Sequence, residues 1–230
     1  MTEPTTYEQI GDVALITMDD GKANVFGPPM IAAVNAGLDR AANEAKAVVL
    51  TGRPGLFSGG FDLNVFRDGG PEEARAMGLA GARLMMRLYG WPQPLVVAAS
   101  GHAIALGALC VLTGDHRLAA DGEFRLGLNE VAIGRTLPPF AWLLARERLS
   151  KRALTQAALT AKMYDPEGAR DAGFVDEVAT ADELPDVALE RAAQLAEFDT
   201  NTFSAMKQGL RGEGIDAVLA GLGEAPSNGS

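Results

Sequence analysis

Two glycine-containing turns carry the backbone groups of this sequence that could take part in a reaction. The first lies in FSGGFDL, residues 57–63, and the second in SGHAIALG, residues 100–107. Each follows an apolar run that is typical of a buried strand. N–H groups at the first turn of a helix have no intrahelical partner. Such groups, when they point into one cavity, can hold a phosphate or an oxyanion that exists only during a reaction.

The common phosphate-binding motifs do not account for these turns. Neither turn contains the lysine of a nucleotide P-loop, and the sequence has no G-x-G-x-x-G motif. A site with one N–H donor from each turn, suited to a developing enolate or tetrahedral oxyanion, is the remaining interpretation. Downstream, Glu130 lies in the apolar segment LNEVAIG. Burial would raise the pKa of Glu130 and suit it to proton transfer, whereas the alternative is an exposed loop glutamate without a catalytic role.

The stretch from Leu95 to Asp115 must position the second turn. Residues 95–99 have the length and composition of a buried parallel strand, Ser100 and Gly101 break the run, and residues 103–112 suit a buried helix. Two other interpretations stay open at this point. One is a membrane span, which two prolines before the stretch and the polar residues in its middle disfavour. The other is a hydrophobic crossover in the core without any chemistry.

Strands and helices alternate over the first 180 residues, which predicts an α/β fold. The purely helical pattern of residues 181–222 predicts an appended C-terminal helical segment, and residues 223–230 predict a flexible tail. The expected strands are 7–9, 13–18, 47–51, 95–99, 116–120 and 174–178, and the expected helices begin at or near Pro28, Pro71, Phe140, Ser150, Pro166, Ala181 and Thr202, the last one ending at Leu210.

The composition excludes several classes of partner. A formal net charge of −10 over 230 residues disfavours a nucleic acid or an anionic membrane as the partner. The single cysteine, Cys110, excludes an internal disulfide, and with only two histidines no ligand set at metal spacing is present, so we expect no metal site. The first twelve residues have no basic region before an apolar core, so no secretory signal is expected, and the predicted location is cytoplasmic.

The order FSGGFDL, then ASGHAIALG, then LNEVAIG resembles the crotonase superfamily, the enoyl-CoA hydratase/isomerase family. The likeness runs from the opening hairpin to about Val178 and more loosely through the terminal helices. It implies a spiral of ββα units with a helical C-terminal region, and an acyl-CoA thioester substrate without a separate cofactor. It also implies a homotrimer or homohexamer, for which uncovered apolar stripes on the later helices are a modest physical reason.

The resemblance also implies roles for individual residues. By position, the two oxyanion donors are the backbone N–H groups of Gly59 and Leu106, and the catalytic carboxylate is Glu130. The family's G-G-G before the central helix is A-L-G here, which keeps the backbone donor at Leu106. The positions implied for CoA binding, besides Gly59 and Leu106, are Lys22, Ala23, Gly60, Phe61, Asp62 and Lys207.

One departure from the family pattern narrows the expected reaction. Hydratases of the family carry two catalytic glutamates, and this sequence has Leu109 at the first position and Glu130 at the second. Leu109 cannot hold or protonate a water, whereas one glutamate suffices to move a proton from C2 to C4. We therefore expect Δ3,Δ2-enoyl-CoA isomerisation. The alternatives are an enoyl-CoA hydratase or other crotonase reaction with a second acid elsewhere, and a non-catalytic acyl-CoA-binding homologue.

For three further polar residues near the motifs, we expect structural roles rather than catalytic ones. We expect His102 to pack or to form a hydrogen bond, because its ring leaves from the strand side of the turn. Asp115 is expected to end the central helix. Asp62 is expected to organise its own loop through hydrogen bonds to the backbone.

Overall fold

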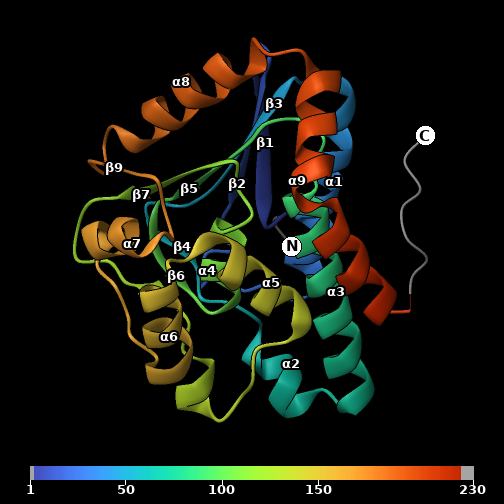
Figure 1. Cartoon of the computed structure of the whole chain (residues 1–230), viewed down its shortest axis with the longest axis vertical. Helices are drawn as coiled ribbons and strands as arrows, with labels where there is room; N and C mark the ends of the chain where they lie inside the picture. The colour runs from blue at the N-terminus through green and yellow to red at the C-terminus, as the bar shows by residue number, and fades with distance from the viewer. Residues whose placement is uncertain (1–2, 224–230) are drawn as a thin grey trace.

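A six-stranded sheet runs through the centre of the protein, whose computed structural model describes residues 3–223 (Figure 1). The first two strands form an antiparallel hairpin, and the other pairs of neighbouring strands are parallel. The sheet order is β1-β2-β3-β5-β7-β9. The strands are β1 (Thr5–Ile10), β2 (Val13–Met18), β3 (Ala47–Gly52), β5 (Leu95–Ala99), β7 (His116–Ala120) and β9 (Glu177–Ala179).

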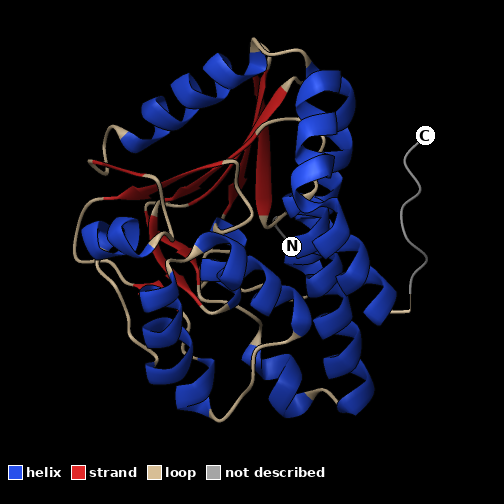
Figure 2. Ribbon diagram, viewed as in Figure 1, coloured by secondary structure: helices blue, strands red, loops and turns tan. Residues whose placement is uncertain are grey.

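A smaller parallel sheet of three strands takes the strand that follows each of β3, β5 and β7. These strands are β4 (Gly55–Ser58), β6 (Gly101–Ile104) and β8 (Leu126–Gly127). The chain turns from one sheet to the other at tight corners. At Gly101 an added Cβ would lie only 2.0 Å from the carbonyl carbon of Gly55, so the corner requires glycine. The repeated step between sheets, with helices outside, forms the ββα spiral implied by the resemblance (Figure 2).

The central strands β3 and β5 of the large sheet are buried on both faces, and their successive apolar residues point to opposite sides. Val49 and Val96 pack on helix α8 (Leu184–Ala196), which lies across one face (Figure 1). Leu50 and Val97 point to the other face and join the main core. This arrangement explains why the strands read as continuous apolar runs in the sequence.

The remaining helices pack around the main core, except α4, whose residues are buried within it. Helix α9 packs against α3 and α5 and contributes Ile215 and Val218 to that core. No helix within residues 3–223 is long and apolar enough to cross a membrane. The helices are α1 (Pro28–Glu44), α2 (Leu63–Asp68), α3 (Pro71–Tyr89), α4 (Leu106–Val111), the 3-10 helix η1 (Glu130–Ile133), α5 (Pro139–Arg148), α6 (Lys151–Thr160), α7 (Pro166–Ala172) and α9 (Thr200–Gly221).

The structure corrects several expected element boundaries. Residues 101–104, of which the last two were expected to be helical, form strand β6, and the central helix is confined to Leu106–Val111. The first expected turn, residues 57–63, begins inside strand β4 and leads into α2. Helix α9 continues to Gly221 rather than ending at Leu210. The expected tail at 223–230 lies outside the described residues except for Gly223, and the division at residue 180 stays a prediction.

Candidate active site

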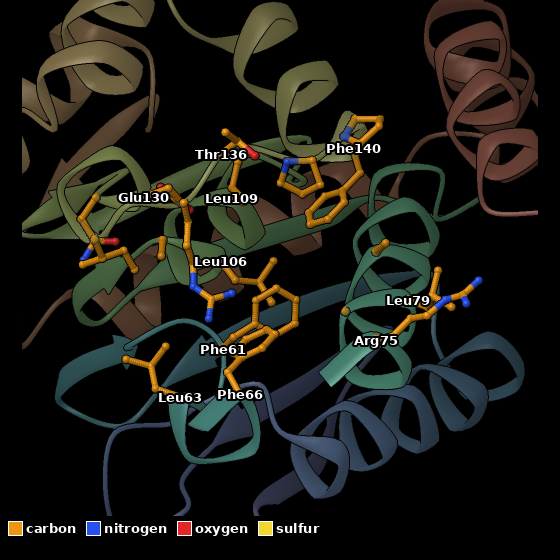
Figure 3. Close-up of a pocket in the computed structure, with 18 of the residues that line it drawn as sticks. Phe61, Leu63, Phe66, Arg75, Leu79, Leu106, Leu109, Glu130, Thr136 and Phe140 are labelled. Atoms are coloured by element: carbon orange, nitrogen blue, oxygen red, sulfur yellow. The ribbon is translucent and has the colours of Figure 1, made fainter. Parts of the chain in front are cut away.

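A cavity of about 380 Å³ opens between the two glycine turns, η1 and helices α3, α5 and α9 (Figure 3). Its walls are mostly aliphatic and aromatic, with a few polar residues. A concave apolar site with a small number of polar groups is the usual form of a small-molecule site. The residues of the sequence motifs that line it are Gly59, Phe61, Leu63, Ala105, Leu106, Leu109, Asn129, Glu130 and Ile133.

The second turn delivers the N–H group of Leu106 to this cavity. Ala105 precedes α4 with φ 53° and ψ −119°, a strained conformation for a residue with a side chain. Leu106 is the first residue of α4, so its N–H has no intrahelical acceptor. No other acceptor in the described part of the chain bonds to it. The expected donor at Leu106 is thus free to bind a ligand.

The first turn presents a different donor from the one expected. The N–H of Gly59 donates to the carbonyl oxygen of Ala23 at 2.9 Å, and the N–H of Gly60 donates to Ser58 Oγ at 3.1 Å. Both groups are therefore occupied by the protein itself. Among residues 3–223, no acceptor bonds to the N–H of Phe61. The structure corrects the expectation for Gly59: the free donor of this turn is Phe61, two residues further on.

The two turns contact each other through glycine. Gly60 has φ 96°, and a Cβ there would lie 3.4 Å from the nitrogen of Leu106 and 3.0 Å from the carbonyl oxygen of Ile104. Only glycine permits both this backbone conformation and this close approach. The Phe61 ring and the Leu106 side chain both reach the same point beside Gly81 of α3. The free N–H groups of Phe61 and Leu106 therefore lie on neighbouring backbone segments that border one cavity.

Glu130 supplies a carboxylate to the same cavity. Its Oε2 atom is buried and has no hydrogen-bond partner within residues 3–223. Burial raises the pKa of Glu130, and the backbone N–H groups of Glu130 and Asn129 offset only part of this effect. Glu130 is the first residue of η1, and it lines the cavity together with Leu106 and Leu109 (Figure 3). A buried carboxyl group with a raised pKa and a free oxygen is suited to accept and return a proton.

Residues 8–219 match the sequence model of the family described as enoyl-CoA hydratase/isomerase. A putative enoyl-CoA hydratase of Thermus thermophilus is 35% identical over 193 residues, which cover 81% of this chain and 74% of that protein. The chain belongs to the enoyl-CoA hydratase/isomerase family, within the crotonase superfamily. It is accordingly an enzyme of that family.

The names of related proteins divide between two reactions. The human mitochondrial enoyl-CoA delta isomerase 1 is 34% identical over 65% of this chain, an alignment that spans half of the human protein. The crystal structure of a probable enoyl-CoA hydratase from Mycobacterium tuberculosis superposes with a TM-score of 0.92 at 39% identity, covering 96% of this chain and 93% of that one. Family membership therefore establishes the fold and the class of enzyme, and both reactions occur among the named relatives.

Two further residues of the cavity lining bear on its chemistry, Leu109 and Asn129. Leu109, which the resemblance places at the position of the first hydratase glutamate, is buried and lines the cavity that also contains Glu130. Asn129 was not singled out in the sequence, yet its Oδ1 atom is buried without a partner in the described chain. Asparagine is a favoured N-cap residue, but the Asn129 side chain does not cap η1 although it stands at the N-cap. The sequence does not reveal this free side chain, because the N-cap position of Asn129 becomes evident only when the bounds of η1 are known.

Of the residues expected along CoA, those at or beside the first turn include Lys22, Ala23, Gly60, Phe61 and Asp62, and of these five Phe61 lines the cavity. Lys22 and Ala23 are exposed, and the bond from Gly59 to Ala23 holds their loop beside the turn. Arg53 Nη2 donates to the carbonyl oxygen of Lys22 at 2.5 Å. Asp62 caps α2 by accepting a hydrogen bond from the N–H of Asn64 at 2.9 Å, which confirms its expected role in its own loop.

Lys207 does not reach this region, which corrects the expectation that it binds a CoA phosphate. Its ammonium group is buried and donates to the carbonyl oxygens of Trp91 and Gln93 at 2.6 and 2.9 Å. It also pairs with Asp115 Oδ2 at 2.5 Å. Burial lowers the pKa of Lys207 to about 8, although Asp115 opposes the change. A side chain with all its donors used inside the core cannot also hold a phosphate.

The other polar residues singled out in the sequence have structural roles. His102 Nδ1 accepts a hydrogen bond from the N–H of Arg125 at 3.1 Å, and its ring packs edge-on against Phe124, as expected for a packing residue. Asp115 does not end the central helix, which stops at Val111 with Leu112 as its C-cap. Asp115 instead accepts a hydrogen bond from the N–H of Leu95 at 2.8 Å and pairs with Lys207. Within residues 3–223, no cluster of three or more histidine, cysteine or acidic side chains could hold a metal ion.

Proposed function

We propose that the protein isomerises Δ3-enoyl-CoA thioesters to Δ2-enoyl-CoA thioesters with Glu130 as its one catalytic carboxylate. The observation that carries this proposal is the unpaired, buried Oε2 atom of Glu130 in a cavity where Leu109 replaces a second acid. One carboxylate can move a proton between two carbons. Addition of water needs that molecule to be held in place as well, and Leu109 offers it no hydrogen bond.

The proposed reaction uses the two free backbone donors. The thioester oxygen would accept hydrogen bonds from the N–H groups of Phe61 and Leu106. Glu130 would take a proton from C2, and the electron pair of that C–H bond would spread over a dienolate whose oxygen charge the donors stabilise. The same carboxyl group would return the proton at C4, leaving the double bond between C2 and C3. An apolar cavity favours this transfer because it keeps bulk water from exchanging with the carried proton.

CoA enters this reaction as part of the substrate, and we expect no separate cofactor. The loop of Lys22 and Ala23 lies against Gly59. We expect this loop to contact the part of CoA that leaves the cavity. The homotrimer or homohexamer and the cytoplasmic location stay predictions from the sequence. A solution mass measurement at micromolar protein addresses the first of these.

Hydration of Δ2-enoyl-CoA is the second candidate, and Asn129 is the observation that favours it. Its buried Oδ1 and the buried Oε2 of Glu130 are both acceptors without partners within residues 3–223, on consecutive residues that line one cavity. A water molecule could donate one hydrogen bond to each. Asn129 would then do for water what a second glutamate does in other hydratases of the family.

The two candidates separate in an assay of matched substrates. Purified protein is given Δ3-enoyl-CoA and Δ2-enoyl-CoA of the same chain length, and kcat/KM is measured for isomerisation and for hydration. The proposal expects the isomerisation value to be the larger. A larger hydration value that Asn129→Leu removes would replace the proposal by the second candidate.

A further inference from the structure

Gly78 is a glycine inside helix α3 that faces the cavity. It lies in the middle of a helix that runs from Pro71 to Tyr89, where glycine is destabilising relative to alanine. Leu79 and Ala82 line the cavity with it, so the cavity-facing stripe of α3 has its smallest residue at position 78. A Cβ atom added to Gly78 would meet no described atom within 4 Å. Nothing in the described protein therefore requires glycine at this position.

Gly81, on the same helix, is a glycine that packing against a neighbouring side chain requires. A Cβ at Gly81 would lie 2.5 Å from the ring of Phe61, so a larger residue would displace the residue that carries a free donor. That glycine is explained by contact between α3 and the first turn. Gly78 has no such contact, and the space in front of it belongs to the cavity. The contrast indicates that the empty space at Gly78 serves a ligand rather than the fold.

The residues that line the cavity near Gly78 indicate which kind of ligand it can hold. Leu79 and Ala82 of α3 and Val218 and Leu222 at the end of α9 line the same cavity and carry no polar side-chain atoms. Arg75, one turn before Gly78, is exposed. Figure 3 shows Arg75 and Leu79 projecting from the same helix, with Phe61 and Leu106 beside them. The other polar side chains of the lining belong to residues 129–136, outside α3 and α9. An unbranched hydrocarbon chain fits the walls formed by α3 and α9, where a polar acyl group would have Arg75 as its polar neighbour.

We propose that Gly78 sets the length of acyl chain that this enzyme accepts, and that its substrates carry straight aliphatic chains of about eight carbons or more. The inference rests on the proposed function, because it places the thioester end at Phe61 and Leu106 and the chain end along α3. A cavity of about 380 Å³ is in the range of sites that hold drug-sized ligands. That volume exceeds what a four-carbon acyl group fills, and the remainder extends to Gly78.

The test measures binding of unreactive saturated thioesters, so that it does not depend on turnover. Butanoyl-, octanoyl- and dodecanoyl-CoA are titrated into the wild type, Gly78→Leu and Gly78→Ala by calorimetry. We expect the wild type to bind dodecanoyl-CoA at least about tenfold more tightly than butanoyl-CoA. Gly78→Leu should lose about tenfold or more on dodecanoyl-CoA and stay within about twofold on butanoyl-CoA, and Gly78→Ala should show a smaller loss of the same kind.

Gly209→Leu is the matched control. Gly209 is also inside a helix, a Cβ there also meets no described atom within 4 Å, and it does not line the cavity. This variant should keep the wild-type order of affinities. Both leucine variants should have a thermal midpoint at or above that of the wild type, because glycine is removed from a helix interior. If Gly78→Leu does not fold, Gly78→Ala carries the test.

Two results would overturn the inference. One is equal affinity of the wild type for butanoyl- and dodecanoyl-CoA, and the other is an unchanged ratio of these affinities in the Gly78 variants. Loss of long-chain binding in Gly78→Leu, together with no turnover of any Δ3-enoyl-CoA by the wild type, would retain the inference and reject the proposed reaction. Absence of binding to every thioester would reject both.

Discussion

Two partly buried carboxyl groups of this protein, those of Asp115 and Glu130, differ in what surrounds them. Asp115 accepts a hydrogen bond from the N–H of Leu95 and pairs with Lys207 at 2.5 Å and with Arg211 at 2.9 Å. Glu130 has one buried oxygen without any partner in the described chain. The charge of Asp115 is compensated by Lys207, Arg211 and a backbone N–H. The carboxyl group of Glu130 has no such compensation and borders the cavity. A fully paired carboxylate stabilises the fold, whereas an unpaired one is available for chemistry.

The contrast also explains where the C-terminal helix lies. Lys207 and Arg211 both belong to α9, and Asp115 follows the central helix α4. The ion cluster therefore ties α9 to the core on one side. On the other side, Val218 of the same helix lines the cavity. Asp115 supports the cavity wall from a distance, and Glu130 acts within it.

The largest expected effect is on turnover in Glu130→Gln. The amide keeps the size of the side chain and removes the base, so isomerisation should fall by about 10²–10⁴-fold or more. Binding of a saturated acyl-CoA should change little. Glu123→Gln is the matched control, because Glu123 is exposed and lies outside the cavity lining. Turnover by Glu130→Gln within tenfold of the wild type would show that another group carries the proton.

The next effect is on stability in Asp115→Ala. This change leaves the ammonium of Lys207 and the guanidinium of Arg211 buried without their anion, which should cost about 3–5 kcal/mol in the free energy of unfolding. Lys207→Met keeps the pair of Asp115 with Arg211 and should cost less. Urea unfolding measures both variants. A loss of under about 1 kcal/mol in Asp115→Ala would contradict the structural role of the cluster.

A smaller effect is expected in the pH dependence of stability. Because burial raises the pKa of Glu130 above its ordinary value of 4.5, the native protein keeps this proton at pH values where the unfolded chain has lost it. The stabilisation is complete below pH 4.5 and is lost as pH rises through the native pKa. Glu130→Gln should therefore gain stability relative to the wild type over this window, whereas turnover of the wild type should increase. A difference in urea midpoints that stays constant from pH 4.5 to 8 would contradict the raised pKa.

The long apolar runs of this fold could be predicted from the sequence, but the short elements between them could not. Residues 95–99 read as a buried strand and are one, because both faces of the large sheet are covered. Strands β4 and β6 have four residues each and begin at glycines, so no periodicity marks them. Helix α9 continues past Gly209 and Gly212 because Ile215 and Val218 are buried in the core, a tertiary contact that outweighs low helix propensity.

In the site too, the sequence predicts which segments meet but not which individual atoms are free to bind a ligand. Glu130 and Leu106 could be placed at the cavity from their motifs. The exchange of Gly59 for Phe61 as the free donor depends on a hydrogen bond to Ala23, which lies 36 residues earlier in the chain. Lys207 reads as an exposed helix residue, and only packing on Asp115 shows that its charge is used internally. Motifs locate backbone segments, and the partners of each N–H decide which group is free.

The central claim is that one buried carboxyl group carries a proton from C2 to C4, and isotope transfer tests it most directly. A Δ3-enoyl-CoA deuterated at C2 is converted in ordinary water for a few turnovers, and the product is analysed by mass spectrometry and NMR. We expect part of the deuterium at C4 of the Δ2-enoyl-CoA, because Glu130 holds it in a cavity that Leu109 keeps apolar. Complete loss of the label to water, or a 3-hydroxyacyl-CoA as the main product, would contradict the account.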